Sequence, residues 1–177
     1  MRFTEAPLAG AWVIDPDRRS DERGFFARTF DREEFAARGL ESAVVQCSTS
    51  YNTRAGTLRG MHFQAAPHGE PKVVRCTQGA IYDVIVDLRP DSPTHRRWFA
   101  TELSAENGRA VYIPVGVAHG FQTVADASEV LYMMGHEYVP EAASGVRWDD
   151  PAFGIAWPDC HQRIMSDRDR SYPDYAG

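Results

Sequence analysis

Apolar and polar residues alternate in short runs along most of this chain, and the alternation predicts β-strands. Turn-forming residues such as Gly79 and Pro114 separate the runs. The predicted strands cover residues 58–64, 72–76, 80–88, 98–103, 110–113, 120–124 and 129–134, and another begins at Val44. We expect the strands at 120–124 and 129–134 to form a hairpin across residues 125–127. Strands about ten residues apart without helices between them are typical of a sandwich or barrel.

Helix signals are few. Residues 31–38 are predicted to form a helix because Asp31 can cap its start, Glu34 follows three residues later and Gly39 can end it. The segment from Trp157 onward is rich in aspartate and arginine and predicts no more than a short helical turn. The chain has no internal repeat or linker. We therefore predict one all-β domain over residues 1–177 with a minor N-terminal helix.

Composition narrows the classes of protein. The 177 residues are 43% hydrophobic and 25% charged, which is ordinary for a globular domain. A net charge of −6 without a long basic run argues against nucleic acid as a main partner. The cysteines, Cys47, Cys76 and Cys160, have neither disulfide-framework nor zinc spacing, so we expect a reduced, cytoplasmic protein. Neither a signal peptide nor an apolar run of the ~20 residues that cross a bilayer is evident.

Lys72 is the only lysine, although the chain has 19 lysine and arginine residues together. Lysine is a compact point donor, whereas arginine is a planar fork, so a single lysine among arginines indicates a task for an ammonium group. His62 and His119 each lie near a glycine in a predicted strand. Alternation places Arg59 and Met61 on the face opposite Gly60 and His62, unless Gly60 marks a bulge.

Two kinds of chemistry suit histidines inside a β-barrel. A metal centre is disfavoured because the chain has no H-x-H pair with a nearby carboxylate. A histidine base, an ammonium and a tyrosine acid form instead a set that can enolise a ketone. A carboxylate beside the histidine would fix its tautomer. The sequence leaves the choice open among Asp83, Asp87, Asp167 and Asp169, and among Tyr82, Tyr112, Tyr132 and Tyr138.

A series of short motifs runs through nearly the whole chain. They are residues 21–26, 56–64, 72, 83–89, 92–93, 112–114, 118–121, 132, 145–151, 157–158 and 166–169. In this order and spacing the chain resembles the dTDP-4-dehydrorhamnose 3,5-epimerase family. The resemblance implies a metal-free and cofactor-free isomerase with a cupin-type jelly roll, a double-stranded β-helix.

The resemblance also implies roles for individual residues. His62 is expected to be the general base with Asp169 as its partner, Tyr132 the acid on the opposite face, and Lys72 the cation at the C4 keto oxygen. The expected substrate contacts are Arg23, Phe26, Arg28, Gln46, Arg59, His119 and Tyr138. Among them, Arg23 would reach the diphosphate from a segment exchanged across a homodimer. Arg28 and Ser48 depart from the glutamate and asparagine that many members have there, which leaves the nucleotide open.

The expected activity is inversion of C3 and C5 in a nucleoside-diphosphate 4-keto-6-deoxyhexose, of the type that converts dTDP-4-dehydro-6-deoxyglucose to dTDP-4-dehydrorhamnose. Both carbons flank the carbonyl, so the same enolate chemistry serves each. Alternatives are a C3-only or C5-only epimerase on another nucleotide sugar and a non-catalytic sugar-nucleotide-binding cupin. The joint presence of base, partner, cation and acid argues against the binder.

Overall fold

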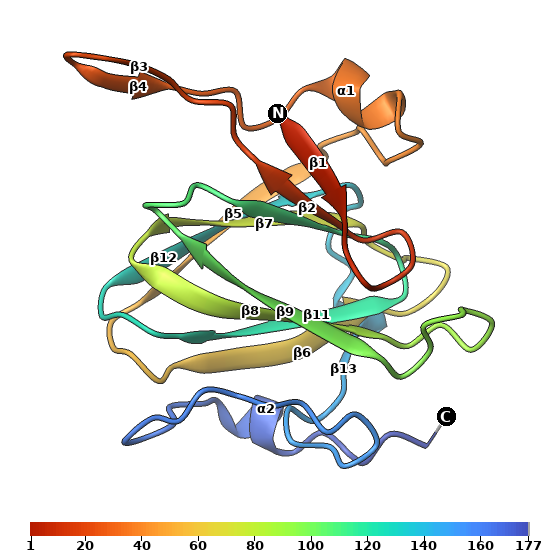
Figure 1. Cartoon of the computed structure of the whole chain (residues 1–177). Coiled ribbons are helices and arrows are strands. Elements are labelled where there is room, and N and C mark those ends of the chain that lie inside the picture. The colour runs from red at the N-terminus through yellow and green to blue at the C-terminus, as the bar shows by residue number, and fades with distance from the viewer. Residues whose placement is uncertain (177) are drawn as a thin grey trace.

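Two facing antiparallel sheets form the body of the protein in the computed structural model, which describes residues 1–176 (Figure 1). The six-stranded sheet has the order β1-β2-β10-β7-β12-β5, and the five-stranded sheet the order β13-β6-β11-β8-β9. The strands are β1 Arg2–Glu5, β2 Trp12–Asp15, β3 Arg19–Asp21, β4 Gly24–Phe26, β5 Gln46–Asn52, β6 Leu58–Gln64, β7 Lys72–Gln78, β8 Ala80–Asp87, β9 Trp98–Ser104, β10 Ala110–Ile113, β11 Val117–Thr123, β12 Ser128–Met134 and β13 Ala143–Gly145. This two-sheet architecture confirms the predicted all-β jelly roll.

The predicted hairpin across residues 125–127 is wrong. β11 pairs with β6 and β8 in the five-stranded sheet, whereas β12 pairs with β5 and β7 in the six-stranded sheet. The connection between them therefore crosses from one sheet to the other. A short polar turn between two alternating runs looks the same in sequence whether the strands pair or not, because pairing partners are chosen by long-range packing.

Both predicted helical segments are present and short. Helix α1 spans Arg32–Ala36, and the side chain of Asp31 accepts hydrogen bonds from the backbone N–H groups of Glu33 and Glu34. Gly39 has a positive φ of 69°, as a helix stop requires. Helix α2 spans Asp167–Arg170 and begins after Ser166, whose hydroxyl accepts from the Asp169 N–H. A 3₁₀ turn, Pro140–Ala142, leads into β13.

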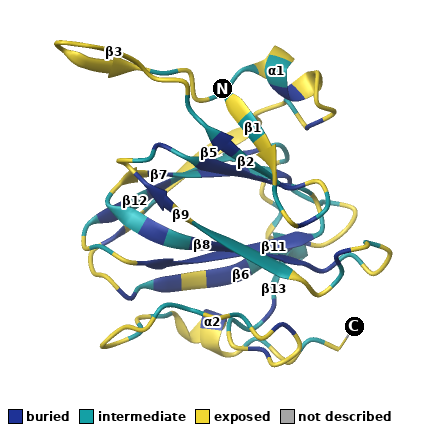
Figure 2. Ribbon diagram, viewed as in Figure 1, coloured by how far each residue is buried: buried dark blue, intermediate teal, exposed yellow. Residues whose placement is uncertain are grey.

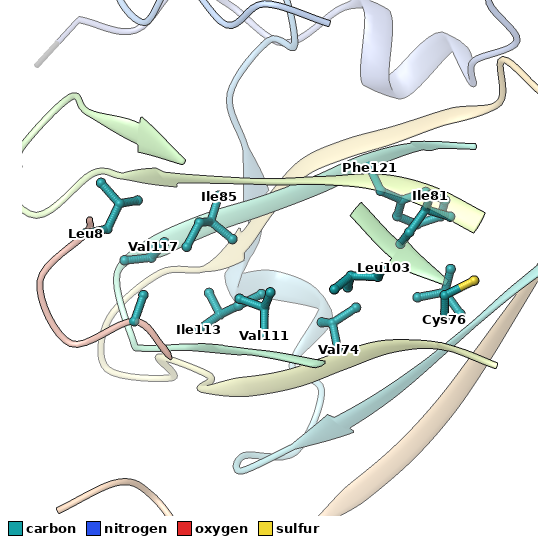
Figure 3. Close-up of a cluster of buried hydrophobic side chains, with 12 residues drawn as sticks. Leu8, Val74, Cys76, Ile81, Ile85, Leu103, Val111, Ile113, Val117 and Phe121 are labelled. Atoms are coloured by element: carbon teal, nitrogen blue, oxygen red, sulfur yellow. The ribbon is translucent and has the colours of Figure 1, made fainter. Parts of the chain in front are cut away.

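Three apolar clusters pack against the sheets. Burial is concentrated in the central strands, whereas β3 and much of β1 are exposed (Figure 2). The first lies between the sheets and includes Val74, Ile85 and Phe121 (Figure 3). The second packs the outer face of the five-stranded sheet against the C-terminal segment, and the third packs the six-stranded sheet against α1 through Phe35. Strand residues alternate between these layers, as their two-residue period requires.

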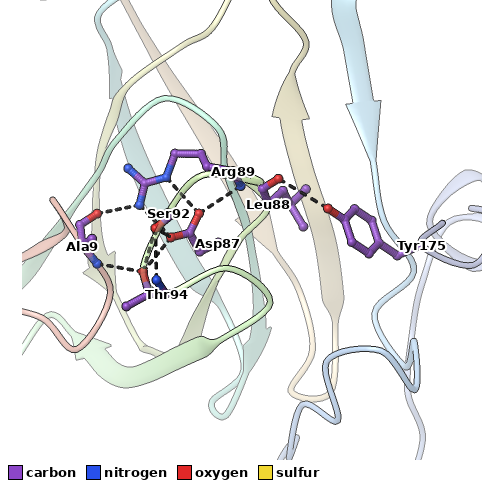
Figure 4. Close-up of polar contacts among 7 residues, drawn as sticks. All are labelled: Ala9, Asp87, Leu88, Arg89, Ser92, Thr94 and Tyr175. Carbon is purple, nitrogen blue, oxygen red and sulfur yellow. Dashed lines mark hydrogen bonds and ion pairs between the residues drawn. The ribbon is translucent and has the colours of Figure 1, made fainter. Parts of the chain in front are cut away.

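A hydrogen-bond network around Asp87 joins the N-terminal loop to the end of β8 (Figure 4). The buried carboxylate accepts from the side chains of Arg89, Ser92 and Thr94. Arg89 and Thr94 in turn bond the carbonyl and the N–H of Ala9, at 2.6 and 3.1 Å. The network lies beside Leu8, which closes the first cluster.

A bulge at Gly60 decides which side chains of β6 face the interior. His62 pairs with His119 and Arg59 pairs with Phe121, so two residues of β6, Gly60 and Met61, lie opposite the single Gly120 of β11. Arg59 and His62 therefore face the same side of the five-stranded sheet. The sequence analysis allowed for this arrangement only if Gly60 marks a bulge. Gly60 has a φ of 139°, and a Cβ there would lie 2.5 Å from the Cα of Gly120, so only glycine fits.

Candidate active site

One pocket of about 690 Å³ is lined by residues of both sheets, including the edge strands β5 and β13, and by α2. Strands β5, β6, β7 and β12 and the C-terminal segment contribute its walls. The lining residues are Gln46, Cys47, Ser48, His62, Phe63, Gln64, Glu70, Lys72, Tyr132, Met134, Tyr138, Ala143, Ser144 and Arg168. Three of the four predicted catalytic residues therefore share one cavity, and the fourth, Asp169, touches it through His62.

His62 and Asp169 form a hydrogen-bonded pair. The imidazole Nε2 lies 2.7 Å from Asp169 Oδ1, and the carboxylate is buried while the imidazole reaches the pocket. Burial alone would raise the pKa of Asp169, but the hydrogen bonds from His62 and from the Gly60 N–H hold it below its ordinary value. Asp169 thus stays ionised near neutral pH and orients the imidazole, and no residue in the range 1–176 bonds the other ring nitrogen, Nδ1.

Lys72 begins β7 and is paired inside the pocket. Its Nζ lies 2.9 Å from Glu70 Oε1, and the two side chains are 14% and 6% exposed. Lys72 pairs in the sheet with Met134, whose side chain lines the same wall. The ammonium is therefore fixed on the six-stranded sheet, across the pocket from β6.

Tyr132 points inward from β12 on the six-stranded sheet. Its hydroxyl lies 3.5 Å from the hydroxyl of Ser50, and its ring meets that of His119 edge-on at 5.9 Å. Burial raises the pKa of Tyr132 well above its ordinary value, and the contact with Ser50 offsets only part of this rise. The phenol is therefore kept protonated, as a proton donor must be. His62 and Tyr132 come from opposite sheets.

A second histidine–carboxylate pair lies deeper between the sheets. His119 Nε2 is 2.6 Å from Asp83 Oδ1, and both side chains are buried. Burial raises the pKa of Asp83, and the neighbouring imidazole of His119 lowers it only in part. Arg59 donates its Nε to Asn52 Oδ1 at 2.8 Å. Neither His119 nor Arg59 lines the pocket, but both face the same side of the five-stranded sheet as His62, and the His119 ring contacts that of Tyr132.

The remaining predicted contacts divide into two groups. Gln46 and Tyr138 line the pocket, and Gln46 Oε1 accepts the Tyr138 N–H at 2.9 Å. Arg23, Phe26 and Arg28 do not line it. Arg23 and Phe26 belong to the β3–β4 hairpin that projects from the sheets (Figure 1), where their side chains are highly exposed. Arg28 bonds Asp31 beside α1 at 2.7 Å.

Sequence reasoning missed two charged residues of the pocket, Glu70 and Arg168. Glu70 stands two positions before Lys72, so its side chain points to the same side of an extended chain. That spacing is visible in the sequence, but it indicates a pocket residue only if the Lys72 side chain is known to face inward. Arg168 directly precedes Asp169 in α2, and its Nε donates to Tyr172 at 3.0 Å. Nothing in its local sequence distinguishes it from other exposed arginines.

Residues 1–176 contain neither a metal-binding cluster nor a helix that could span a membrane. Within that range, no group of three or more histidine, cysteine, aspartate or glutamate side chains has a metal-binding arrangement. None of the helices in the same range has the length and apolar character needed to cross a membrane.

Comparison with known proteins places the chain. Residues 5–176 match the family model described as dTDP-4-dehydrorhamnose 3,5-epimerase. The dTDP-4-dehydrorhamnose 3,5-epimerase of Methanothermobacter thermautotrophicus is 44% identical, over 97% of this chain and 93% of that protein. A crystal structure of the Bacillus anthracis dTDP-4-dehydrorhamnose 3,5-epimerase with TDP and PPi bound superposes with a TM-score of 0.94. It is 40% identical and covers 98% of this chain and 99% of that chain.

A structure of ChmJ, a 3'-monoepimerase from Streptomyces bikiniensis in complex with dTDP-quinovose, is 35% identical with a TM-score of 0.89. That match covers 96% of this chain and 85% of ChmJ. Fold, pocket and relatives together define a jelly-roll epimerase, an enzyme of the isomerase class. The chain belongs to the dTDP-4-dehydrorhamnose 3,5-epimerase family.

Proposed function

We propose that this protein inverts C3 and C5 of a dTDP-linked 4-keto-6-deoxyhexose, converting dTDP-4-dehydro-6-deoxyglucose to dTDP-4-dehydrorhamnose. The observation that carries the proposal is the pocket in which His62, held by Asp169, stands opposite Tyr132 with Lys72 between the sheets. Family membership and the TDP bound to the Bacillus anthracis relative support the reaction and the nucleotide.

The first step is removal of a proton from carbon. Because Nε2 of His62 is bound to Asp169, Nδ1 is the nitrogen that takes the proton from C3 or C5. The electron pair of the broken C–H bond forms the C=C bond of an enolate, and the negative charge moves to the C4 oxygen. The Lys72 ammonium donates a hydrogen bond to that oxygen, where the charge develops.

The second step returns a proton from the other face. Tyr132 donates its phenolic proton to the same carbon, which inverts the centre, and the C4 carbonyl re-forms. His62 then holds one extra proton and Tyr132 lacks one, so exchange with solvent must restore both before the next inversion. The raised pKa of Tyr132 keeps the acid loaded before reaction and makes its phenolate a strong base that readily regains a proton.

The diphosphate end of the substrate needs cations. Arg168 lines the pocket, and Arg59 lies outside the lining but faces the same side of β6 as His62. Arg23 and Phe26 belong to the same proposal through a homodimer. Their hairpin carries Phe26, 74% exposed, away from its own sheets, while β5 lies at the sheet edge beside the pocket. We assign the hairpin to the pocket of a second copy, so that each site has an arm from its partner.

A reducing, cytoplasmic location also belongs to the proposal, supported by three free cysteines.

Deuterium exchange tests the function directly. The protein is incubated in D₂O with 4-keto-6-deoxyglucose linked to dTDP, CDP, GDP or UDP, and deuterium at C3 and C5 is followed by NMR. Incorporation at both carbons with the dTDP sugar is the expected result. Incorporation at one carbon would assign a mono-epimerase, the activity named for ChmJ. An absence of exchange with all four nucleotides would overturn the enzymatic proposal and favour a binding protein.

A further inference from the structure

Glu70 is the acidic residue in contact with the lone lysine. Its Oε1 lies 2.9 Å from Lys72 Nζ, and its side chain is 6% exposed at the pocket wall. Within residues 1–176, Glu70 is the only acidic partner within ion-pair distance of Lys72. We propose that Glu70 is the positioning residue that holds the Lys72 ammonium toward the reacting oxygen of the substrate, an inference that rests on the proposed epimerase function.

The backbone holds Glu70 and Lys72 on one side of the chain. Pro71 separates them, and its carbonyl accepts the Gly135 N–H at 2.9 Å, which ties the segment to the end of β12. A Cβ at Gly135 would lie 2.8 Å from Pro71 Cγ, so the two segments pack closely. Proline also restricts its own backbone and that of Glu70. The carboxylate is thus part of the pocket wall before any ligand arrives.

The pairing suits an ammonium that must act at one point. A lysine side chain has four rotatable methylene groups and three N–H donors. Glu70 occupies one donor and restricts the side chain, which leaves two donors for a ligand. Catalysis by a charged donor gains most when the donor is already oriented before the charge develops. Arginine could not make the same arrangement, because its planar fork would direct two donors at the carboxylate.

The Glu70–Lys72 pair also gives the lysine and the arginines of the pocket different roles. Glu70 compensates the charge of Lys72 where the two meet, so the anionic diphosphate is left to the arginines. Removal of Glu70 makes the pocket more positive and its lysine less ordered. We therefore expect a lower kcat without a higher KM, a combination that a general loss of structure would not produce.

Because the chain has one lysine, its ammonium arm can be observed alone. In protein labelled with ¹³C-lysine, the ε-CH₂ group gives a single carbon signal, and an ordered side chain gives two distinct proton shifts on it. We expect two shifts in the wild type and one averaged shift in Glu70→Ala. Glu70→Gln retains an oxygen acceptor and should keep the shifts apart. Glu102→Gln, an exposed change on β9, is the matched control and should match the wild type.

Kinetics supply the second test, with deuterium exchange as the assay. Glu70→Ala should lower kcat about 10-fold, Glu70→Gln should recover most of that loss, and KM should not rise. In a Lys72→Ala background, Glu70→Ala should cost nothing further, because it acts through the lysine. Two proton shifts in Glu70→Ala, or a loss that simply adds to that of Lys72→Ala, would overturn the positioning role. A wild type without exchange would overturn the proposed function, while the NMR readout still decides on Glu70.

Discussion

The imidazole Nε2 of His62 lies 2.7 Å from Oδ1 of Asp169, although 107 positions separate the two residues. The contact joins β6 to α2, the helix that packs outside the five-stranded sheet (Figure 1). Gly60, also in contact with the Asp169 carboxylate, supplies the bulge that turns His62 inward. The geometry of the candidate base thus depends on the C-terminal segment as much as on the strand.

Asp169→Asn tests that dependence. The amide keeps the shape but removes the negative charge that orients the ring, so deuterium exchange should slow by about 100-fold or more. His62→Ala should slow it further. Asp167→Asn, an exposed change in the same helix, is the control and should exchange normally. Full exchange in His62→Ala would show that another group is the base.

Tyr132→Phe separates exchange from inversion. His62 can still remove a proton and return deuterium to the same face, whereas the opposite face has lost its donor. We expect deuterium at C3 and C5 of recovered substrate with little inverted product, measured by NMR and by product separation. Tyr51→Phe alters an exposed tyrosine on β5 and should leave both readouts unchanged. Normal inversion by Tyr132→Phe would place the acid elsewhere.

Lys72→Arg tests the need for a point cation. The charge is kept, but the guanidinium is larger, planar and drawn into two hydrogen bonds with Glu70, so it cannot occupy the site of the ammonium. Turnover should fall by about 10- to 100-fold with an unchanged thermal midpoint. Arg97→Lys, an exposed exchange of the same two residue types, is the control. Near-normal turnover in Lys72→Arg would make the single lysine incidental.

We expect the Asp87 carboxylate to make the free energy of unfolding depend on pH. Burial raises the pKa of this carboxyl, but hydrogen bonds from Arg89, Ser92 and Thr94 lower it by more than burial raises it. The pKa in the folded protein is therefore well below the ordinary value. A depressed pKa stabilises the fold above the unfolded-state pKa of about 4, and that contribution is lost as pH falls below it.

Asp87→Asn should lower the free energy of unfolding by about 3 kcal/mol at pH 7, because Arg89 loses its buried partner. Urea unfolding from pH 7 to pH 3 should show the difference from wild type shrinking below about pH 4. Asp91→Asn, an exposed change in the following loop, should show no such trend. A difference that stays constant to pH 3 would contradict this role.

Hybrid dimers test the proposed exchange of hairpins. Arg23→Ala and His62→Ala subunits should each be nearly inactive alone. In a hybrid, the intact His62 receives the intact Arg23 of the other subunit. Random mixing should restore about a quarter of wild-type activity, because half of the dimers are hybrids with one complete site of two.

A mixture of His62→Ala with Lys72→Ala is the matched control. Both residues lie in the pocket of their own chain, so no complete site forms and no activity should return. Failure of the Arg23→Ala mixture to recover would place the arm outside the partner's site. Different affinity tags on the two subunits, used for purification one after the other, check that hybrids form.

The sequence by itself determined the type of fold and the set of reactive groups. Two-residue alternation specifies strands because side chains point to opposite faces, and the run at 58–64 became β6 without change. Asp31 capped its helix because capping is decided within a few residues. Lys72 was conspicuous as the only lysine, and motif order indicated the family.

Only the tertiary structure decided which groups meet. Four aspartates and four tyrosines were candidates from the residues alone. The position of α2 brings Asp169 against His62, and Tyr132 and Tyr138 are the two candidate tyrosines that line the pocket. The same long-range pairing placed β11 and β12 in different sheets. The contact between Glu70 and Lys72 was also visible only in the tertiary structure. Local patterns record which face a residue takes, whereas contacts between distant residues depend on the packing of the whole chain.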